Sequence, residues 1–382
     1  MNNINNKTKL AMILSTDYQS WPIGGTLTYI RNIIPFFDEK YDLTIFGVSV
    51  NKNEKKNVSI NNKNYNINIY ANVNSPRKKI PNFLLTFLGM FKNYKKLKDF
   101  DILVFHSSLE LIALKIRYGK NLPYSVFIQH SFSYLKSKKI LLKYYYKILG
   151  SLSYKLSDLN LIVTDNDSFD EYIQKKGIKN NFFRIGSPID YYEITKRNKQ
   201  LSNTCIKFVY TGRLSVEKQV DKTIMAFISF TKKYNVNSTL DLIGSGPLEQ
   251  SLKEYVSSKG LNSKIKFHGN KSYTEIKESL CSYDIFLMSS MGEGVSLSTL
   301  EAMAAGLPVI AYDVTGMRNL VENGVNGYLS INDNIEDFVN NMNLCISNYE
   351  ILSTNALITA EKFDKKNISK EIINIIDNNY VQ

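Results

Sequence analysis

The chain has 382 residues, which is long enough for two domains of ordinary size. Its hydrophobic share of 43% is typical of a globular protein, and its three cysteines (Cys205, Cys281 and Cys345) lie far apart without metal-ligand spacing, which excludes a disulfide scaffold and indicates a reducing compartment. The net charge of +13 belongs to one half of the chain. Residues 1–200 carry 31 Lys or Arg and 15 Asp or Glu, whereas residues 201–382 carry 17 and 20.

No segment of the sequence predicts export or membrane crossing. The first residues lead directly into the apolar run 10–15, which lacks the length and the cleavage site of a signal peptide. The most apolar segment elsewhere, 83–91, has about half of the ~20 residues needed to span a bilayer. We therefore expect a cytoplasmic protein.

The first half alternates short apolar runs with longer amphipathic stretches, the pattern of parallel βα units. Strands are predicted at 10–15, 43–50, 65–71, 101–107, 124–130 and 160–164. Helices are predicted at 26–37, within the basic segment 77–98, at 109–117 and within 135–156. Residues 1–195 are therefore predicted to form a doubly wound, Rossmann-like domain.

A polar segment without periodicity, residues 190–204, is predicted to be a linker, and after it the same alternation begins again. Strands are predicted at 206–212, 239–246, 265–269, 284–290, 307–313 and 327–330, and helices at 218–234, 247–259, 274–281, 296–305 and 316–322. We expect a second Rossmann-like domain at 205–360, facing the first across a cleft. The helical segment 361–382 is predicted to pack back on the first domain.

Two glutamates flank a predicted helix start in the segment MGEGVSLSTLEAMAAGLPVIAYD, 291–313. Glu293 precedes the flexible Gly294, Ser296 or Ser298 can cap the helix, and Glu301 lies inside it. Free amides at a helix N-terminus form an anion site. Paired carboxylates also occur as the acid and nucleophile of glycosidases, or simply as surface charges. The strand-loop-helix context favours a site for a nucleotide sugar.

A second block, TGRLSVEK at 211–218, places two cations after a buried strand. Arg213 and Lys218 can neutralise a diphosphate and stabilise the charge that develops on it when a glycosidic bond breaks. The alternative is that both residues are charges that aid solubility.

These two blocks resemble the E-x7-E and G-R-L-x-x-x-K signatures of retaining glycosyltransferases of GT-B fold, in particular glycosyltransferase family four. The sequence departs from the second signature at Gln219, where glycine is commoner. The resemblance implies that Glu293 binds donor-sugar hydroxyls, that Glu301 binds the ribose, and that the diphosphate lies on Arg213 and Lys218. It also implies that the donor lies against the backbone of the segment that comprises Gly294, Val295, Ser296, Leu297 and Ser298.

Further residues match the family pattern less specifically. Gly24 and Gly25 resemble its glycine loop near the diphosphate, and His130 resembles the histidine beside the donor sugar. Gly244, in GSGP at 244–247, is equally consistent with a tight turn, and His268 with an ordinary structural histidine at a strand end. The same applies to His106, which is the weaker of the two candidates in the first half.

A D-x-D triplet, Asp165 to Asp167, is the motif that holds a divalent metal in glycosyltransferases of GT-A fold. Here it lies between a predicted strand and helix, where Asp and Ser serve as caps. We therefore predict no metal and no cofactor.

The sequence thus predicts a retaining enzyme that transfers a sugar from a nucleotide-sugar donor, expected to be a UDP-sugar, in bacterial polysaccharide or glycoconjugate synthesis. The expected acceptor is a saccharide, a lipid-linked glycan or a cell-surface polymer. The alternatives are an inactive GT-B partner subunit and a nucleotide-sugar epimerase. A nucleic-acid partner is not expected, because stacking aromatics on a basic groove and recognised modules are lacking. The basic segments 77–98 and 135–156 fit an anionic membrane face, a polyanionic acceptor, or helices with a solvated lysine face.

Overall fold

The computed structural model describes residues 7–15, 17, 25–50, 55–60, 63–73, 82–130, 140–164, 169–170, 173–174, 181–191, 201 and 204–380, with the backbone alone at 25, 55 and 140–147. The chain forms two compact units. Unit 1 comprises residues 1–164, 169–186 and 366–382, and unit 2 comprises 165–168 and 187–365. The sequence-based boundaries at 195 and 361 lie near these, and most of the predicted linker 190–204 lies outside the described residues.

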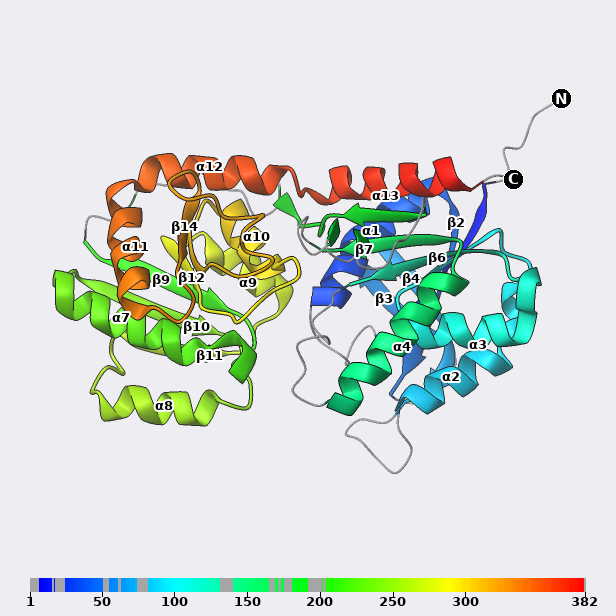
Figure 1. The fold of residues 1–382 in the computed structure, drawn as a ribbon, viewed down its shortest axis with the longest axis horizontal. Helices are drawn as coiled ribbons and strands as arrows, with labels where there is room; N and C mark the ends of the chain where they lie inside the picture. Colours follow the sequence, from blue (N-terminus) through cyan, green and yellow to red (C-terminus); the bar gives the residue numbers. More distant parts are fainter. Residues whose placement is uncertain are drawn as a thin grey trace. The chain divides into compact units, whose positions relative to one another are not determined.

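Unit 1 is built on an eight-stranded sheet of order β3-β4-β2-β1-β5-β6-β7-β8 (Figure 1). Every neighbouring pair is parallel except β3 and β4. The strands are β1 (Lys9–Ile13), β2 (Asp42–Ser49), β3 (Lys55–Ile60), β4 (Lys63–Asn72), β5 (Ile102–Phe105), β6 (Tyr124–Gln129), β7 (Leu159–Val163) and β8 (Phe182–Ile185). The helices are α1 (Gly25–Lys40), α2 (Asn82–Lys92), α3 (Ser108–Tyr118), α4 (Ile140–Leu156) and α13 (Lys365–Asn379), with short 3₁₀ turns at Tyr94–Leu97 and Gly119–Asn121.

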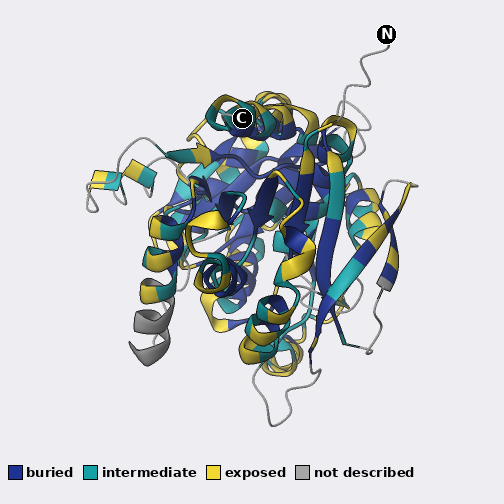
Figure 2. Ribbon diagram, turned by 90° about the vertical axis from the view of Figure 1, so that its right-hand side faces the viewer, coloured by how far each residue is buried: buried dark blue, intermediate teal, exposed yellow. Residues whose placement is uncertain are grey.

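The core of unit 1 follows from the apolar strands that the sequence predicts. The side chains from Leu10 to Ile13 in β1, from Ile102 to Phe105 in β5 and from Leu159 to Val163 in β7 are all buried. All of them are apolar except Asn160. Figure 2 shows buried strands in the interior and surrounding helices that expose their outer turns. Strands buried on both faces are expected where helices cover both faces of a parallel sheet.

The structure adds two strands to unit 1 that the sequence did not predict. β3, with the sequence KKNVSI, is an antiparallel edge strand with too many polar residues to show the usual alternation of apolar and polar residues. β8 has only four residues, which is too short for a clear pattern. Lys56 of β3 is buried and binds Asp17 at 2.5 Å. An edge strand needs little apolar sequence, because only one of its sides pairs with a neighbour.

Unit 2 contains a six-stranded sheet, entirely parallel, of order β11-β10-β9-β12-β13-β14. The strands are β9 (Ile206–Thr211), β10 (Ser238–Ile243), β11 (Ile265–Gly269), β12 (Ile285–Met288), β13 (Val309–Tyr312) and β14 (Gly327–Ser330). The helices are α7 (Val220–Tyr234), α8 (Glu249–Ser258), α9 (Tyr273–Leu280), α10 (Leu297–Ala304), α11 (Ile335–Ser347) and α12 (Tyr349–Glu361), and a 3₁₀ turn spans Val216–Lys218. The predicted doubly wound α/β architecture is confirmed for both units.

One predicted helix of unit 2, at 316–322, is wrong. The segment is a series of turns in which the amides of Met317 and Leu320 each bond the carbonyl three residues earlier. Gly316 has a φ of +87°, in the left-handed region that a right-handed helix does not accept. Gly316 therefore marks a turn and does not begin a helix.

Among the described helices, none combines the length and the apolar character that a membrane-spanning segment requires.

Close packing of α2 against β4 at Gly89 leads to a test of the fold. A Cβ there would lie 2.6 Å from both Ala71 Cβ and the Tyr70 carbonyl oxygen. Helix propensity alone would make Gly89→Ala stabilising by about 1 kcal/mol. Because both contacts are rigid, we expect instead a destabilisation of about 1–3 kcal/mol, measured by urea denaturation. A stabilisation by Gly89→Ala, as helix propensity alone predicts, would contradict the packing argument.

Candidate active site

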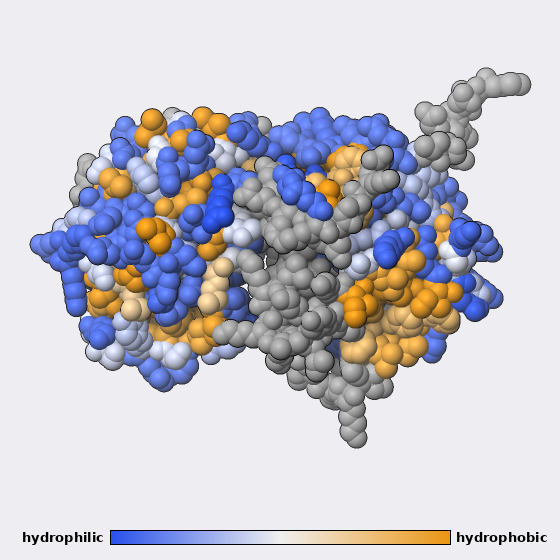
Figure 3. Space-filling view, viewed as in Figure 1, coloured by the Kyte–Doolittle hydropathy of each residue, from blue (hydrophilic) through white to orange (hydrophobic). Residues whose placement is uncertain are grey.

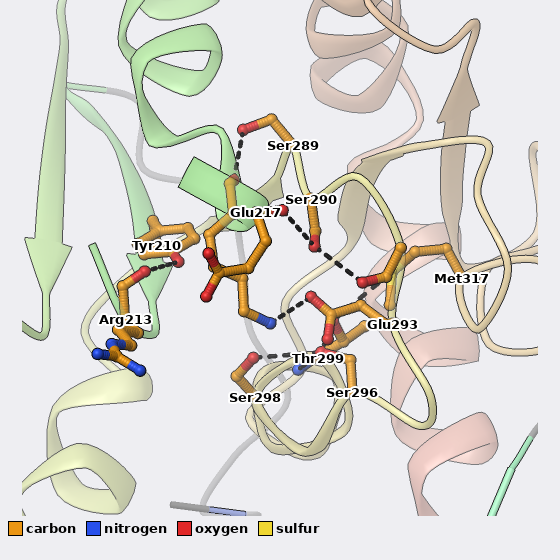
Figure 4. Close-up of polar contacts among 12 residues, drawn as sticks. Tyr210, Arg213, Glu217, Ser289, Ser290, Glu293, Ser296, Ser298, Thr299 and Met317 are labelled. Atoms are coloured by element: carbon orange, nitrogen blue, oxygen red, sulfur yellow. Dashed lines mark hydrogen bonds and ion pairs between the residues drawn. The ribbon is translucent and has the colours of Figure 1, made fainter. Parts of the chain in front are cut away.

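Two loops of unit 2 meet at the carboxyl edge of its sheet because β9 and β12 are neighbouring parallel strands. The loop after β9 spans 212–219 and the loop after β12 spans 289–296. Ser290 Oγ donates to the Glu217 carbonyl at 3.2 Å (Figure 4). The Met291 amide donates to the same oxygen at 2.9 Å, and Ser289 Oγ donates to the Gln219 carbonyl at 2.6 Å. These bonds hold the second loop to backbone carbonyls of the first.

Backbone geometry explains why glycine is commoner than Gln219 in the motif that the first loop resembles. Gln219 has φ +46°, in the left-handed region. The carbonyl of Gln219 accepts a hydrogen bond from Ser289, so the residue with the strained backbone also links the two loops.

An ion pair lies between the two loops. Lys218 Nζ is 2.5 Å from Glu293 Oε1, and the side chains are 24% and 11% exposed. In Figure 4 the Glu293 carboxylate points toward the β9 loop, close to Ser296 and Ser298. A cation and a carboxylate are therefore adjacent and partly shielded from water, where their interactions are stronger than at an open surface.

The backbone at Glu293 is held from a third loop. Its amide donates to the Thr315 carbonyl at 3.0 Å. A Cβ on Gly316 would lie 2.3 Å from the Gly294 carbonyl oxygen and 2.6 Å from that of Glu293. Gly316 is thus needed for close approach of the turn to the Glu293 loop, and sequence reasoning missed it. The available signal was a glycine shortly after a buried strand.

Helix α10 begins directly beyond this loop. Ser296 is its N-cap and accepts from the Thr299 amide, while Thr299 Oγ1 donates to Ser296 Oγ at 2.9 Å. Ser298 Oγ lies 3.2 Å from the same oxygen. Val295 and Leu297 pack partly against the core and anchor the first turn. The positive end of the helix dipole thus lies beside the Lys218–Glu293 pair.

Glu301 lies inside α10 and is only 7% exposed. Burial raises the pKa of its carboxyl to about 8, and the Lys277 ammonium opposes this shift. Lys277 itself is bound to Asp190 at 3.0 Å. Near neutral pH, Glu301 is therefore mainly a protonated carboxyl, able to donate as well as accept a hydrogen bond.

The structure does not bring Arg213 into the ion pair. Its side chain is exposed, and in Figure 4 the guanidinium lies apart from Glu293. Tyr210 fixes the backbone instead, because its hydroxyl donates to the Arg213 carbonyl at 3.0 Å. Of the two predicted cations, only Lys218 contacts the predicted glutamate.

Gly244 is explained by backbone packing. It has φ +133°, and a Cβ on it would lie 2.0 Å from the Gly212 carbonyl oxygen. The neighbouring Ser245 carbonyl accepts from the Leu214 amide at 3.0 Å. The glycine loop after β10 therefore supports the loop that carries Lys218, and its predicted role as a donor ligand stays a prediction.

His268 contacts protein groups in the structure. Its Nε2 lies 3.1 Å from Asp241 Oδ2, which also accepts from the Tyr283 hydroxyl at 2.9 Å. These contacts account for the histidine structurally, and a role near the nucleotide base stays a prediction.

The candidate residues of unit 1 lie at the carboxyl edge of its own sheet. His106 and His130 follow the neighbouring parallel strands β5 and β6, and His106 Nδ1 is 2.7 Å from His130 Nε2. Tyr29 of α1 meets the His130 ring edge-on, with centroids 4.7 Å apart. Gly25 is the first residue of α1, whereas Gly24 lies outside the described residues.

Both histidines are neutral at physiological pH. Burial lowers the pKa of His130 to about 3. Burial, together with the neighbouring His130, lowers the pKa of His106 well below its usual range. One ring must donate to the other across their short contact, so the tautomers are coupled. His130 can therefore offer a ligand hydrogen bonds but no positive charge.

The D-x-D triplet at 165–167 lies outside the described residues. Within the described ranges, no group of three His, Cys, Asp or Glu side chains has the arrangement of a metal site.

Comparisons with known proteins identify the class of enzyme. Residues 192–376 match the family model described as glycosyl transferases group 1. An uncharacterized glycosyltransferase of Methanocaldococcus jannaschii is 28% identical over 342 residues, which cover 84% of this chain and 85% of that protein. HepE of Anabaena, solved in complex with UDP, superposes with a TM-score of 0.75 at 17% identity, over 97% of this chain and 100% of HepE. The chain is a glycosyltransferase.

The solved structures also identify the fold. Sucrose-phosphate synthase from Thermosynechococcus elongatus superposes with a TM-score of 0.79 at 14% identity, over 97% of this chain and 98% of that one. Together with HepE it shows that the two Rossmann-like units of this glycosyltransferase are the two domains of a GT-B fold.

The buried carboxyl of Glu301 predicts a pH dependence of stability. From about pH 4.5 to about pH 8 the unfolded chain ionises this group while the folded protein keeps the proton, so stability falls as pH rises through this window. Glu301→Gln has no carboxyl at this position and therefore lacks this fall in stability with rising pH. The stability of the wild type relative to the variant should therefore fall by up to about 1.4 kcal/mol per pH unit.

Urea midpoints of both proteins from pH 5 to pH 9 measure the difference. The exposed Glu278→Gln serves as the control. A constant difference between wild type and Glu301→Gln over this range would show that Glu301 is ionised throughout.

Proposed function

We propose that this glycosyltransferase is a retaining enzyme of family four that uses a UDP-sugar donor. The observation that carries the proposal is the contact between Lys218 and Glu293 beside the N-terminus of α10. In a nucleotide sugar the anomeric carbon is bonded directly to the diphosphate. A cation that binds the phosphate and a carboxylate that binds the sugar hydroxyls must therefore be neighbours, as these two side chains are.

The remaining groups of unit 2 complete a donor site in this proposal. Lys218, Arg213 and the first amides of α10 bind the diphosphate and stabilise the charge that develops on it as it departs. Glu293 accepts hydrogen bonds from sugar hydroxyls. Glu301, further along the same helix, binds the ribose. The positive groups would perform the neutralisation that a divalent metal performs in other transferases, so the proposal requires no metal.

We further propose a front-side mechanism. The acceptor hydroxyl attacks the anomeric carbon from the side that the diphosphate leaves, and a diphosphate oxygen takes the hydroxyl proton. Glu293 bonds to Lys218 and is assigned to binding, so it is not placed as the nucleophile of a double displacement. Catalysis then rests on positioning and on electrostatic stabilisation.

UDP is proposed because HepE has been solved with UDP and with UDP-glucose. We propose that unit 1 holds the acceptor, a saccharide, lipid-linked glycan or cell-surface polymer of bacterial glycoconjugate synthesis. Neutral His130, with its ring fixed by His106 and Tyr29, suits contact with sugar hydroxyls.

Two substitutions separate the roles of the ion pair. Lys218→Met should weaken UDP binding about tenfold and reduce transfer about 100-fold, because it removes a charge from the leaving group. Glu293→Gln should keep UDP binding close to wild type and still reduce transfer about 100-fold. Calorimetry with UDP and donor turnover provide the two readouts.

The matched control is Lys253→Met, which breaks the exposed Lys253–Glu249 pair of α8. It should leave both readouts unchanged, and thermal melting checks that all three variants fold. If Glu293→Gln transferred sugar at a rate near that of the wild type, the result would contradict the assignment of Glu293 to the donor-sugar site.

Stereochemistry tests the mechanism. A panel of UDP-sugars, with hydrolysis as the first readout, identifies the donor. The anomeric configuration of the initial transfer product is then read from its proton coupling by NMR. We expect the configuration of the donor to be kept. Inversion would contradict the front-side mechanism while leaving glycosyl transfer intact.

A further inference from the structure

Helix α2 of unit 1 exposes apolar side chains where a surface helix normally exposes polar ones. Its inner face is formed by Thr86 and Met90, which are 5% and 0% exposed. Phe83, Leu84 and Leu88 are 49%, 40% and 43% exposed. The usual amphipathic pattern, with apolar groups inward and polar groups outward, is therefore partly reversed.

The apolar surface continues onto the helix beside it. α2 packs against α3, whose Ile116 is 64% exposed. Phe87 and Phe91 of α2 stack on each other with centroids 6.4 Å apart. Figure 3 shows a broad hydrophobic area on the part of unit 1 where α2 and α3 lie in Figure 1. Contiguous exposed apolar area of this kind marks an interaction surface.

Basic residues accompany this surface. Residues 82–121 contain seven Lys or Arg and three Asp or Glu, and one of the three acids, Glu110, is buried. The exposed basic residues of this stretch are Lys92, Lys95, Lys96, Lys98, Arg117 and Lys120. Arg117 lies over the Tyr94 ring, with its guanidinium carbon 4.4 Å from the centroid, and donates to the Tyr94 hydroxyl at 3.2 Å. Aromatic, aliphatic and cationic groups thus occur together at one surface.

We propose that α2, the 3₁₀ turn after it and the exposed end of α3 attach this protein to the surface of an anionic phospholipid bilayer. Phe83, Leu84 and Leu88 would enter the boundary between headgroups and acyl chains, and Lys95 and Lys96 would bind lipid phosphates. Large apolar side chains beside lysines are the composition of helices that lie in a membrane interface. The excess of positive charge selects anionic lipid.

This attachment goes beyond sugar transfer and depends on none of its steps. It concerns unit 1, whereas the proposed donor site lies in unit 2. A vesicle-binding experiment with the full chain therefore tests it independently of any donor or acceptor.

The test is sedimentation with vesicles of phosphatidylcholine alone and of phosphatidylcholine with phosphatidylglycerol. We expect binding to the mixed vesicles at least about tenfold stronger than to the neutral ones, decreasing as salt increases. The double variant Phe83→Asp/Leu88→Asp should lose about tenfold or more of this binding, and Lys95→Glu/Lys96→Glu should lose binding mainly to the anionic vesicles.

The matched control replaces exposed apolar residues of unit 2, Ile351→Asp/Ile358→Asp on α12, which are 59% and 52% exposed in the wild type. This control should bind vesicles like the wild type. UDP-sugar hydrolysis and thermal melting should be unchanged in all variants, because every substituted residue is exposed.

Three outcomes would overturn the proposal. The wild type could bind neither kind of vesicle, it could bind both equally, or the α2 variant could bind as well as the α12 control. Self-association that the α2 variant abolishes, without vesicle binding by the wild type, would assign the surface to a second copy of the chain instead.

Discussion

The parallel pairing of β9 with β12 is the constraint on which the candidate active site depends. Neighbouring parallel strands end at the same edge of the sheet, so the loops that follow them meet although they are far apart in the sequence. Backbone carbonyls of the first loop accept from Met291, Ser290 and Ser289 of the second. The contact between Lys218 and Glu293 is a consequence of this joined pair of loops.

Glycines set the distance at which the surrounding backbone can approach. Gly316 allows a turn to lie against the Glu293 backbone, and Gly244 allows the next loop to lie against residue 212. At both positions a Cβ would meet a carbonyl oxygen well inside van der Waals contact. The geometry of the charged pair therefore also depends on positions that carry no side chain.

The sequence was sufficient for those parts of the fold that depend on local pattern. Buried parallel strands appear as short apolar runs, and nearly all of them were predicted. β3 was missed because an edge strand can be polar, and the helix at 316–322 was wrongly predicted because Gly316 is left-handed there. The roles of Arg213, Lys218 and Glu293 in a donor site stay predictions, and pattern alone could not show that Lys218 contacts Glu293 while Arg213 lies apart.

Burial gives the two units different chemistry at their sheet edges. In unit 2, Lys218 and Glu293 form an ion pair, and this contact offsets the cost of their partial desolvation. In unit 1, His106 and His130 lack a carboxylate partner among the described contacts, and burial leaves both neutral. A charged edge suits a diphosphate, whose charge increases during transfer. A neutral edge with fixed hydrogen-bonding groups suits sugar hydroxyls, because it can orient them without binding the phosphate in competition.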